Sequence, residues 1–288
     1  MNDKRNVSAV GQAPQEDPES LLAAIDFSTP HISRIYDYIL GGKDNFAVDR
    51  EAAEEFIKSM PGIVLTIRAG RPVLGRMVRF LVDSGVRQFL DIGAGLPTAA
   101  STHEVAQQAA PECRIVYVDN DPMVLAHARA LLTSTPEGRT SYLDADLRDT
   151  DRILDHARTV LDFSQPVAIM LMAILHYIED LDQAHQIVAR LLDAVPSGSF
   201  LVITHAGIDL FPEEIGPFEK VLNQHLPDDH HIARTRDAVT GLFDGCGCWS
   251  LAWLRPPPPP RCGAESPSSR NPVTCQSASM GVTGLAAL

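Results

Sequence analysis

Acidic side chains occur at the ends of three successive segments of the chain that could form strands of a parallel sheet. Asp91 lies in "FLDIG", Asp119 closes "RIVYVD" and Asp146 lies in "DADLRD". A carboxylate accepts hydrogen bonds and attracts positive charge, so each could bind ribose hydroxyls or an amine. Each acid alone could also cap a helix or end a strand. An acid after each of three runs indicates a shared binding site.

The turn after the first of these runs, "GAGLPT", contains Gly93 and Gly95. Glycines let the backbone approach a ligand closely, although such a pair is equally compatible with a tight turn alone. A dinucleotide site presents a third glycine and a helix N-terminus to a pyrophosphate, which Asp91 would repel. Leu96 and Pro97 also replace the continuation of that motif. The turn therefore favours a ligand with positive groups and no phosphate, such as S-adenosylmethionine, over a nicotinamide cofactor.

Alternating patterns in the middle of the chain predict an α/β fold with a mostly parallel sheet flanked by helices. The runs "VAIMLMA" and "FLVIT" are apolar throughout, which is typical of central strands covered on both faces. Ligands of such sheets bind beyond the carboxyl ends of the strands, where the three acids would meet. Strands are expected at 88–92, 114–118, 140–143, 167–173 and 199–204, and helices at 98–109, 122–132, 150–161 and 180–194.

Helices are also expected before the sheet. "PHISRIYDYILGGKDNFAVDREAAEEFIKSM" has the spacing of two short helices around Gly41 and Gly42, and a third helix is predicted over 72–84. We expect residues 26–86 to form a helical cap and residues 87–254 to form the cofactor-binding domain.

Composition excludes several classes of protein. The 288 residues carry a formal net charge of −13 with no dense Lys/Arg run, so a nucleic-acid partner is not expected. No apolar run approaches the roughly 18 to 20 residues that span a bilayer. Residues 1–25 are polar and lack the apolar segment of a secretory signal. We therefore expect a disordered lead over residues 1–25 of a cytoplasmic protein that does not enter the membrane.

Four segments resemble the successive motifs of Rossmann-like, class I S-adenosylmethionine-dependent methyltransferases: "FLDIGAGLPT", "VYVDNDPMVLAHARALL", "DADLRD" and "LMAILHYIED". "TPHISRIYDYILGGKDNFAVDRE" is similar to the N-terminal signature of a bacterial family of S-adenosyl methyltransferases. The resemblance runs from about Asp26 to Asp244. It implies that S-adenosylmethionine is the cofactor. Because the acidic charge disfavours nucleic acid, we expect the methyl acceptor to be a small molecule.

The resemblance also implies roles for individual residues. Asp91, Gly93 and Gly95 would line the methionine half of the cofactor, and Asp119 with Asn120 would hold the ribose. Asp146 and Leu147 would flank the adenine, and Ala173 would face the side of methyl transfer. Three residues of the N-terminal block are candidate contacts of a cap that folds over the cofactor: Tyr36, Gly42 and Asn45.

His176 is the candidate catalytic residue, because it is the titratable group after the fourth strand and could deprotonate an acceptor. Flanked by Leu175 and Tyr177, it could equally be a packed side chain. The Asp/Asn-Pro-Pro-aromatic turn of amino-methylating DNA enzymes is absent from "AILHYIED", which further disfavours a nucleic-acid substrate. His230 and His231 match no closed set of metal ligands, so no metal is expected.

The composition changes abruptly from Gly245 on, where four of the five cysteines and a run of five prolines occur. We expect an atypical Pro/Ser-rich tail over 255–288, with no strand beyond Leu254. "WSLAWL" is offered as one of the two strands that would finish the resembled fold. The tail is either a disordered extension or, as a hypothesis, the product of a shifted reading frame. An altered end leaves open the alternative of a non-catalytic protein that binds the adenosyl ligand.

Overall fold

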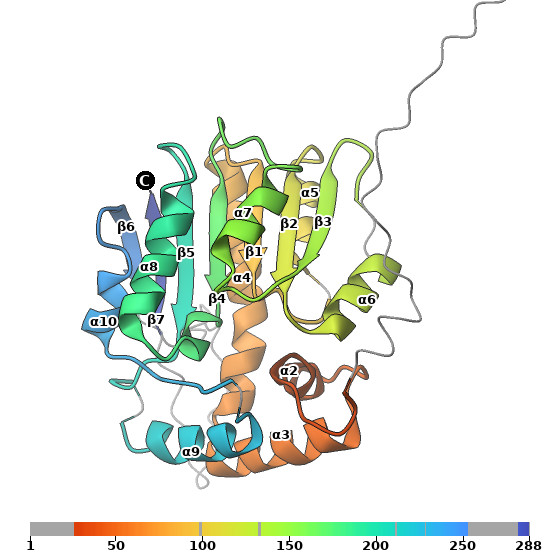
Figure 1. The fold of residues 1–288 in the computed structure, drawn as a ribbon, viewed down its shortest axis with the longest axis vertical. Helices are drawn as coiled ribbons and strands as arrows, with labels where there is room; N and C mark the ends of the chain where they lie inside the picture. The colour runs from red at the N-terminus through yellow and green to blue at the C-terminus, as the bar shows by residue number, and fades with distance from the viewer. Residues whose placement is uncertain are drawn as a thin grey trace, which may run out of the picture.

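A seven-stranded sheet in the order β3-β2-β1-β4-β5-β7-β6 forms the centre of the fold (Figure 1). The computed structural model describes residues 26–97, 100–131, 134–210, 212–227, 229–252 and 282–287. The first five strands are parallel, as predicted. Their bounds are Gln88–Ile92 (β1), Arg114–Asp119 (β2), Arg139–Asp144 (β3), Ala168–Met172 (β4) and Phe200–His205 (β5).

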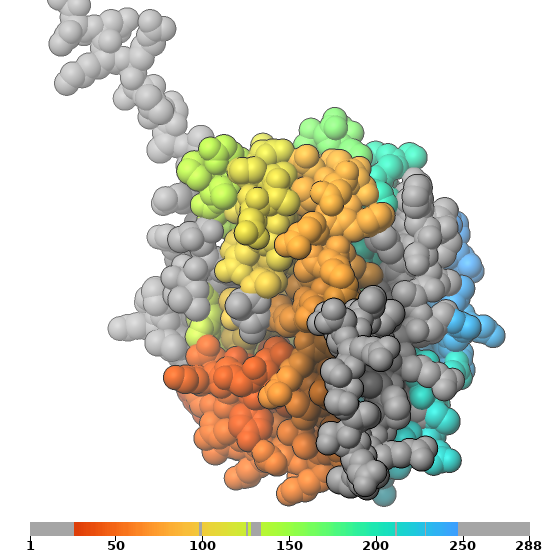
Figure 2. Space-filling model, turned by 180° about the vertical axis from the view of Figure 1, so that it is seen from behind, coloured from red at the N-terminus to blue at the C-terminus, as the bar shows by residue number. Residues whose placement is uncertain are grey.

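Helices cover both faces of this sheet. Consecutive residues of a strand point to opposite faces, so Leu90 and Ile169 pack beneath one helical layer while Phe89 and Met170 pack beneath the other. The layer drawn in front in Figure 1 contains α7 (Thr150–Ala157) and α8 (Leu181–Leu192). The layer behind contains α4 (Ile63–Asp83) and α5 (Thr102–Ala109), drawn orange and yellow in Figure 2. The remaining helices of the sheet region are α6 (Pro122–Leu131), the short η1 (Leu175–Tyr177) and α10 (Arg236–Gly241).

A separate apolar cluster lies at the carboxyl ends of the parallel strands. It joins α2 (Ile32–Leu40), α3 (Ala47–Ser59), the first turns of α4 and α9 (Ile215–His225), which lie together at the bottom of Figure 1. Phe56 and Phe218 pack edge to face, with ring centroids 5.9 Å apart. We call this assembly of α2, α3, α9 and the start of α4 the cap. No helix in the described part of the chain combines the length and apolarity needed to cross a membrane.

The third N-terminal helix begins earlier than the sequence indicated. The expected helix begins at residue 72, and a proline does suit the first turn of a helix, but α4 begins at Ile63 and runs through Pro72. The helix loses one backbone hydrogen bond there. Burial of Ile67 in the cap and of Leu74 and Val78 against the sheet offsets that loss. One continuous helix therefore connects the cap to the sheet.

The expectation of no strand beyond Leu254 was wrong. β7 (Val282–Ala287) pairs antiparallel with β5 and with β6 (Gly247–Ala252), which contains most of "WSLAWL". The sequence of β7, "VTGLAA", holds glycine and alanines, which are depleted in strands, so its pattern gave no signal. Residues 1–25 and the other residues of 255–288 lie outside the described part of the chain.

Candidate functional site

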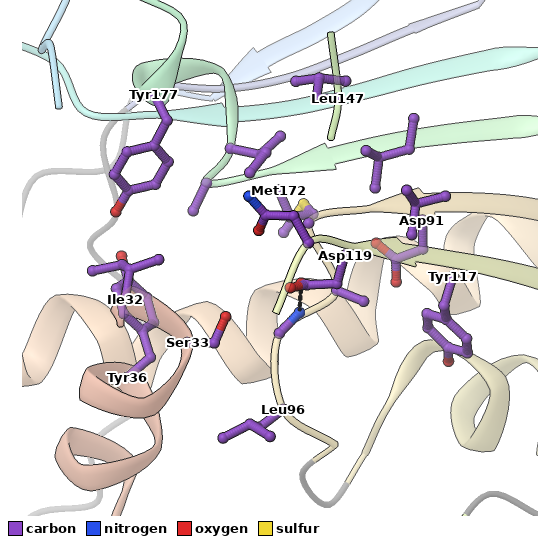
Figure 3. Close-up of a pocket in the computed structure, with 18 of the residues that line it drawn as sticks. Ile32, Ser33, Tyr36, Asp91, Leu96, Tyr117, Asp119, Leu147, Met172 and Tyr177 are labelled. Atoms are coloured by element: carbon purple, nitrogen blue, oxygen red, sulfur yellow. Dashed lines mark hydrogen bonds between the residues drawn. The ribbon is translucent and has the colours of Figure 1, made fainter. Parts of the chain in front are cut away.

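A cavity of about 200 Å³ lies between the carboxyl ends of β1 to β4 and the cap (Figure 3). Its walls come from the strand-to-helix turns, from α2 and from α4. The structure brings nine of the residues predicted as cofactor contacts into this wall: Tyr36, Asp91, Gly93, Gly95, Asp119, Asn120, Asp146, Leu147 and Ala173. Parallel strands place their ends along one edge of the sheet, which is why residues far apart in the sequence meet here.

Asp119 organises the turn after β1 from the end of β2. One carboxylate oxygen accepts a hydrogen bond from the backbone N–H of Gly95 at 2.7 Å, drawn dashed in Figure 3. The other accepts from the N–H of Asp121 at 3.1 Å. Burial raises the pKa of Asp119, and these two hydrogen bonds oppose that shift. Each oxygen retains a lone pair and Asp119 lines the cavity, so the carboxylate has the capacity to accept two further hydrogen bonds from a ligand.

Asp91 is a buried carboxylate at the end of β1. The hydroxyl of Thr102 donates a hydrogen bond of 2.6 Å to it. Burial raises the pKa of Asp91 to about 6, while the Thr102 hydrogen bond and the charge of Arg71 partly oppose that shift. Arg71 projects from α4 into the same cavity wall. Acidic and basic groups side by side are suited to a ligand that carries both an ammonium and a carboxylate.

The two glycines of the turn serve different needs. Both adopt left-handed backbone angles, with φ of +79° at Gly93 and +65° at Gly95. A Cβ at Gly93 would lie 2.9 Å from the side chain of Ile174, so this position also requires close packing. A Cβ at Gly95 would meet no atom within 4 Å, and the position therefore leaves space for a ligand.

The opposite wall comes from β3, β4 and β5. Asp146 pairs with Arg148 at 2.9 Å, and Arg148 also donates to the carbonyl oxygen of Tyr177 at 2.8 Å. This contact joins the turn after β3 to η1. Ala173 adopts a left-handed φ of +54°, and its N–H donates to the hydroxyl of Thr204 at 2.8 Å. These hydrogen bonds fix the turns after β3 and β4 that line the cavity.

Two predicted contacts from the N-terminal block do not reach the cavity. The amide of Asn45 donates to the carboxylate of Asp37 at 2.8 Å, and the N–H of Gly42 donates to the Asp37 carbonyl oxygen at 2.8 Å. A Cβ at Gly42 would collide with the Asp37 carboxylate. Gly42 and Asn45 therefore build the turn between α2 and α3, while Asp37 itself lines the cavity.

His176 lies outside the wall of the 200 Å³ cavity. It is 3% exposed and lines a second, smaller cavity, together with His205 and His231. His230 is separated from His231, because it pairs with Glu179 at the surface at 2.7 Å. Within the described residues, no group of three or more His, Cys, Asp or Glu side chains could hold a metal ion.

The sequence reasoning missed several wall residues, including Arg71, Thr102 and Tyr117. Arg71 lies in "RAGRPVLGR", and the sequence of a helix does not show whether such an arginine side chain points toward a cavity or toward solvent. Thr102 lies in α5 and Tyr117 in the middle of β2, whereas most of the residues predicted from the sequence lie at the ends of strands. Only the three-dimensional arrangement shows that they face Asp91.

A further missed residue, His31, connects the cap to the end of β2. Its Nδ1 lies 3.1 Å from a carboxylate oxygen of Asp121. Burial alone would lower the pKa of His31, but the hydrogen bond and the charge of Asp121 and the charge of Asp119 raise it overall, against the opposing charge of Arg34. The same pair lowers the pKa of Asp121, although burial opposes this. The ion pair is therefore strongest in mildly acidic solution.

We expect His31→Asn to lower the free energy of unfolding by on the order of 1 kcal/mol at pH 5.5 and much less at pH 8.5. The raised pKa of His31 stabilises the fold below the ordinary value of 6.5 and ceases to do so as the pH rises through the raised value. Asparagine is a favoured residue before the first turn of a helix and has no charge, so the substitution removes the titrating group without disfavouring the start of α2. Urea unfolding at both pH values measures the effect, and a loss independent of pH would contradict the ion pair.

The fold and the cavity define a class of protein. A parallel sheet with acids after its first strands, a glycine turn after β1 and an antiparallel β7 beside β5 is the Rossmann-like fold of class I methyltransferases, as predicted. A model of the S-adenosyl methyltransferase family matches residues 18–250, and the chain belongs to that family. The assignment confirms the recognised family and its cofactor, S-adenosylmethionine.

Two solved structures have similar sequences and the same fold. A protein of the DUF574 family from Streptomyces avermitilis MA-4680 is 36% identical, with a TM-score of 0.79, and the match covers 91% of this chain and 98% of that one. A candidate methyltransferase from Thermobifida fusca YX is 38% identical, with a TM-score of 0.77 and coverage of 91% and 96%. A search of the curated proteins gives no match.

Proposed function

We propose that this protein transfers the methyl group of S-adenosylmethionine to a small molecule. The observation that carries the proposal is the arrangement of Asp91, Gly95 and Asp119 around one cavity, with the Asp119 carboxylate on the Gly95 N–H. The cap closes over the carboxyl ends of the strands, and this enclosure favours a small acceptor over a macromolecule.

The residues of the wall fit the parts of the cofactor. Asp119, with Asn120, accepts hydrogen bonds from the ribose hydroxyls with its remaining lone pairs. Asp91 attracts the ammonium, and Arg71 attracts the carboxylate of the methionine end. At the other end, Leu147 is 6% exposed and gives the adenine an apolar surface. Asp146, beside it, accepts from the exocyclic amine.

When bound, S-adenosylmethionine supplies a methyl group on a sulfonium, and displacement by the acceptor breaks the carbon–sulfur bond with its electron pair remaining on sulfur. The protein's task is then to align the acceptor and to exclude water. Tyr36 of α2 and Tyr177 of η1 point toward one another at the cap side of the cavity (Figure 3). Burial raises the pKa of Tyr36 to about 12, so its hydroxyl stays neutral. The acceptor approaches between these side chains.

The test is a calorimetric titration of the full chain with S-adenosylmethionine, with NAD as the comparison ligand. We expect saturable binding of S-adenosylmethionine and none of NAD, because Asp91 would face a pyrophosphate in the turn after β1. Formation of S-adenosylhomocysteine with a panel of small acceptors would then measure turnover. A folded chain that binds NAD, or that does not bind S-adenosylmethionine, would refute the proposal.

A further inference from the structure

A second cavity, of about 70 Å³, adjoins the cofactor cavity beneath the cap. Its volume has room for several water-sized groups, because one water needs roughly 10 to 15 Å³. Six residues line both cavities: Ile32, Tyr36, Ile67, Ala173, Tyr177 and Thr204. A molecule in the second cavity therefore lies directly beside a cofactor in the first.

The wall of the second cavity is mostly apolar. Aliphatic and aromatic side chains of the cap supply most of it, among them Ile35, Phe56 and Phe218. None of the described residues that line it is an aspartate, glutamate, lysine or arginine. A charged ligand would lose its hydration here without gaining an ion pair, which costs several kcal/mol.

His176 is a buried polar side chain of this wall whose ring nitrogens have no partner. Neither of its ring nitrogens makes a hydrogen bond, although the ring is buried. The neighbouring histidines are already engaged. The Nδ1–H of His205 donates to Ala206 and its Nε2 accepts from Arg234, both at 2.9 Å, and the Nδ1 of His231 lies 3.1 Å from Glu219. Buried polar groups are normally hydrogen-bonded, so the ring nitrogens of His176 are available to a ligand that enters this cavity.

The ring of His176 is neutral at physiological pH. Burial, with the neighbouring His231, His205 and Arg234, holds its pKa well below the ordinary value. The rings of His231 and Tyr177 face it, with centroids 4.4 Å and 4.6 Å away. A neutral imidazole offers one N–H donor and one acceptor nitrogen. A hydroxyl group can pair with either, because it both accepts and donates hydrogen bonds. The low pKa disfavours the proton-accepting role expected from the sequence.

We propose that the second cavity binds the methyl acceptor, that this acceptor is a small, uncharged and largely apolar molecule with a hydroxyl group, and that His176 hydrogen-bonds that hydroxyl. The proposal rests on the proposed function, because the protein has a methyl acceptor only if it is a methyltransferase. Because His176 lines the second cavity and not the first, it holds the end of the acceptor remote from the cofactor. It is thus a binding and specificity residue.

The test uses four matched probes on the full chain saturated with S-adenosylhomocysteine: phenol, benzene, benzoate and benzylamine. Ligand-observed NMR gives the dissociation constants, and the ¹⁵N resonances of the His176 ring report contact. We expect phenol to bind about tenfold more tightly than benzene, the value of one hydrogen bond, and more tightly than either charged probe. In His176→Phe the advantage of phenol over benzene should vanish, while His176→Gln should keep part of it.

The control is His230→Phe, which changes the neighbouring surface histidine and should preserve all four affinities. Tighter binding of benzoate or benzylamine, or a phenol preference that survives in His176→Phe, would overturn the proposal. Affinity for S-adenosylhomocysteine should be unchanged in His176→Phe, because His176 lies outside the cofactor cavity. If the wild-type chain binds no S-adenosylhomocysteine, the proposed function fails, and the probe series on the cofactor-free chain still tests the second cavity.

Discussion

Asp119→Ala should weaken the binding of S-adenosylmethionine by about 100-fold or more. Two hydrogen bonds from ribose hydroxyls to a carboxylate are lost, each worth about 1.5 to 3 kcal/mol when one partner is charged. The variant also removes the acceptors of the Gly95 and Asp121 N–H groups, which lie 2.7 Å and 3.1 Å from the carboxylate. The turn after β1 would then lose its fixed position as well. Calorimetric titration measures the loss.

Two further variants separate these causes. Asp119→Asn keeps an oxygen and the side-chain shape but removes the charge, so we expect an intermediate loss. Asp151→Ala removes an exposed carboxylate that pairs with Arg190 on the surface at 2.7 Å, and it should bind the cofactor like the wild type. If a folded Asp119→Ala chain bound S-adenosylmethionine within a few-fold of the wild type, the ribose role of Asp119 would be wrong.

Most of the site could be predicted from the sequence where its residues lie at the ends of strands, and Tyr36 of α2 was predicted from the resemblance of the N-terminal block. Asp91, Asp119 and Asp146 lie at or just after strand ends, and parallel strands place such residues along one edge of the sheet. Arg71 could not be found this way, because it lies inside α4 and reaches the cavity only through the direction of that helix. Asn45 was misplaced because a polar residue after a glycine turn can face a ligand or, as here, its own helix terminus.

The strands of the fold also divide into those that the sequence pattern predicted and one that it did not. Four of the five parallel strands have apolar runs, β3 (RTSYLD) being the exception, and the observed bounds of all five differ from the expected ones by one residue at most at either end. β7 was missed because its position depends on tertiary pairing with β5 and β6 and not on its own sequence pattern. The surroundings of His176 could not be predicted from the sequence either. Sequence shows a histidine after β4, but not that its neighbours would bury it without a partner.

Arg234→Met should lower the free energy of unfolding by about 3 to 5 kcal/mol, a typical cost of breaking a buried charged network. The guanidinium is buried and donates to the carbonyl oxygens of Leu175 and Ile178, the first at 2.8 Å, and to Nε2 of His205 at 2.9 Å. Methionine fills much of the same volume but leaves these acceptors without a donor. Urea unfolding of both proteins gives the difference.

Arg79→Met is the matched control, because Arg79 is exposed on α4, and it should change stability by less than about 0.5 kcal/mol. Arg234→Lys should fall between the two, since one ammonium cannot reproduce the planar fork of a guanidinium. A loss below about 1 kcal/mol in Arg234→Met would show that η1 is held mainly by apolar packing. Because η1 carries both Tyr177 and His176, the expected larger loss means that the same arginine stabilises the fold and positions the wall shared by the two cavities.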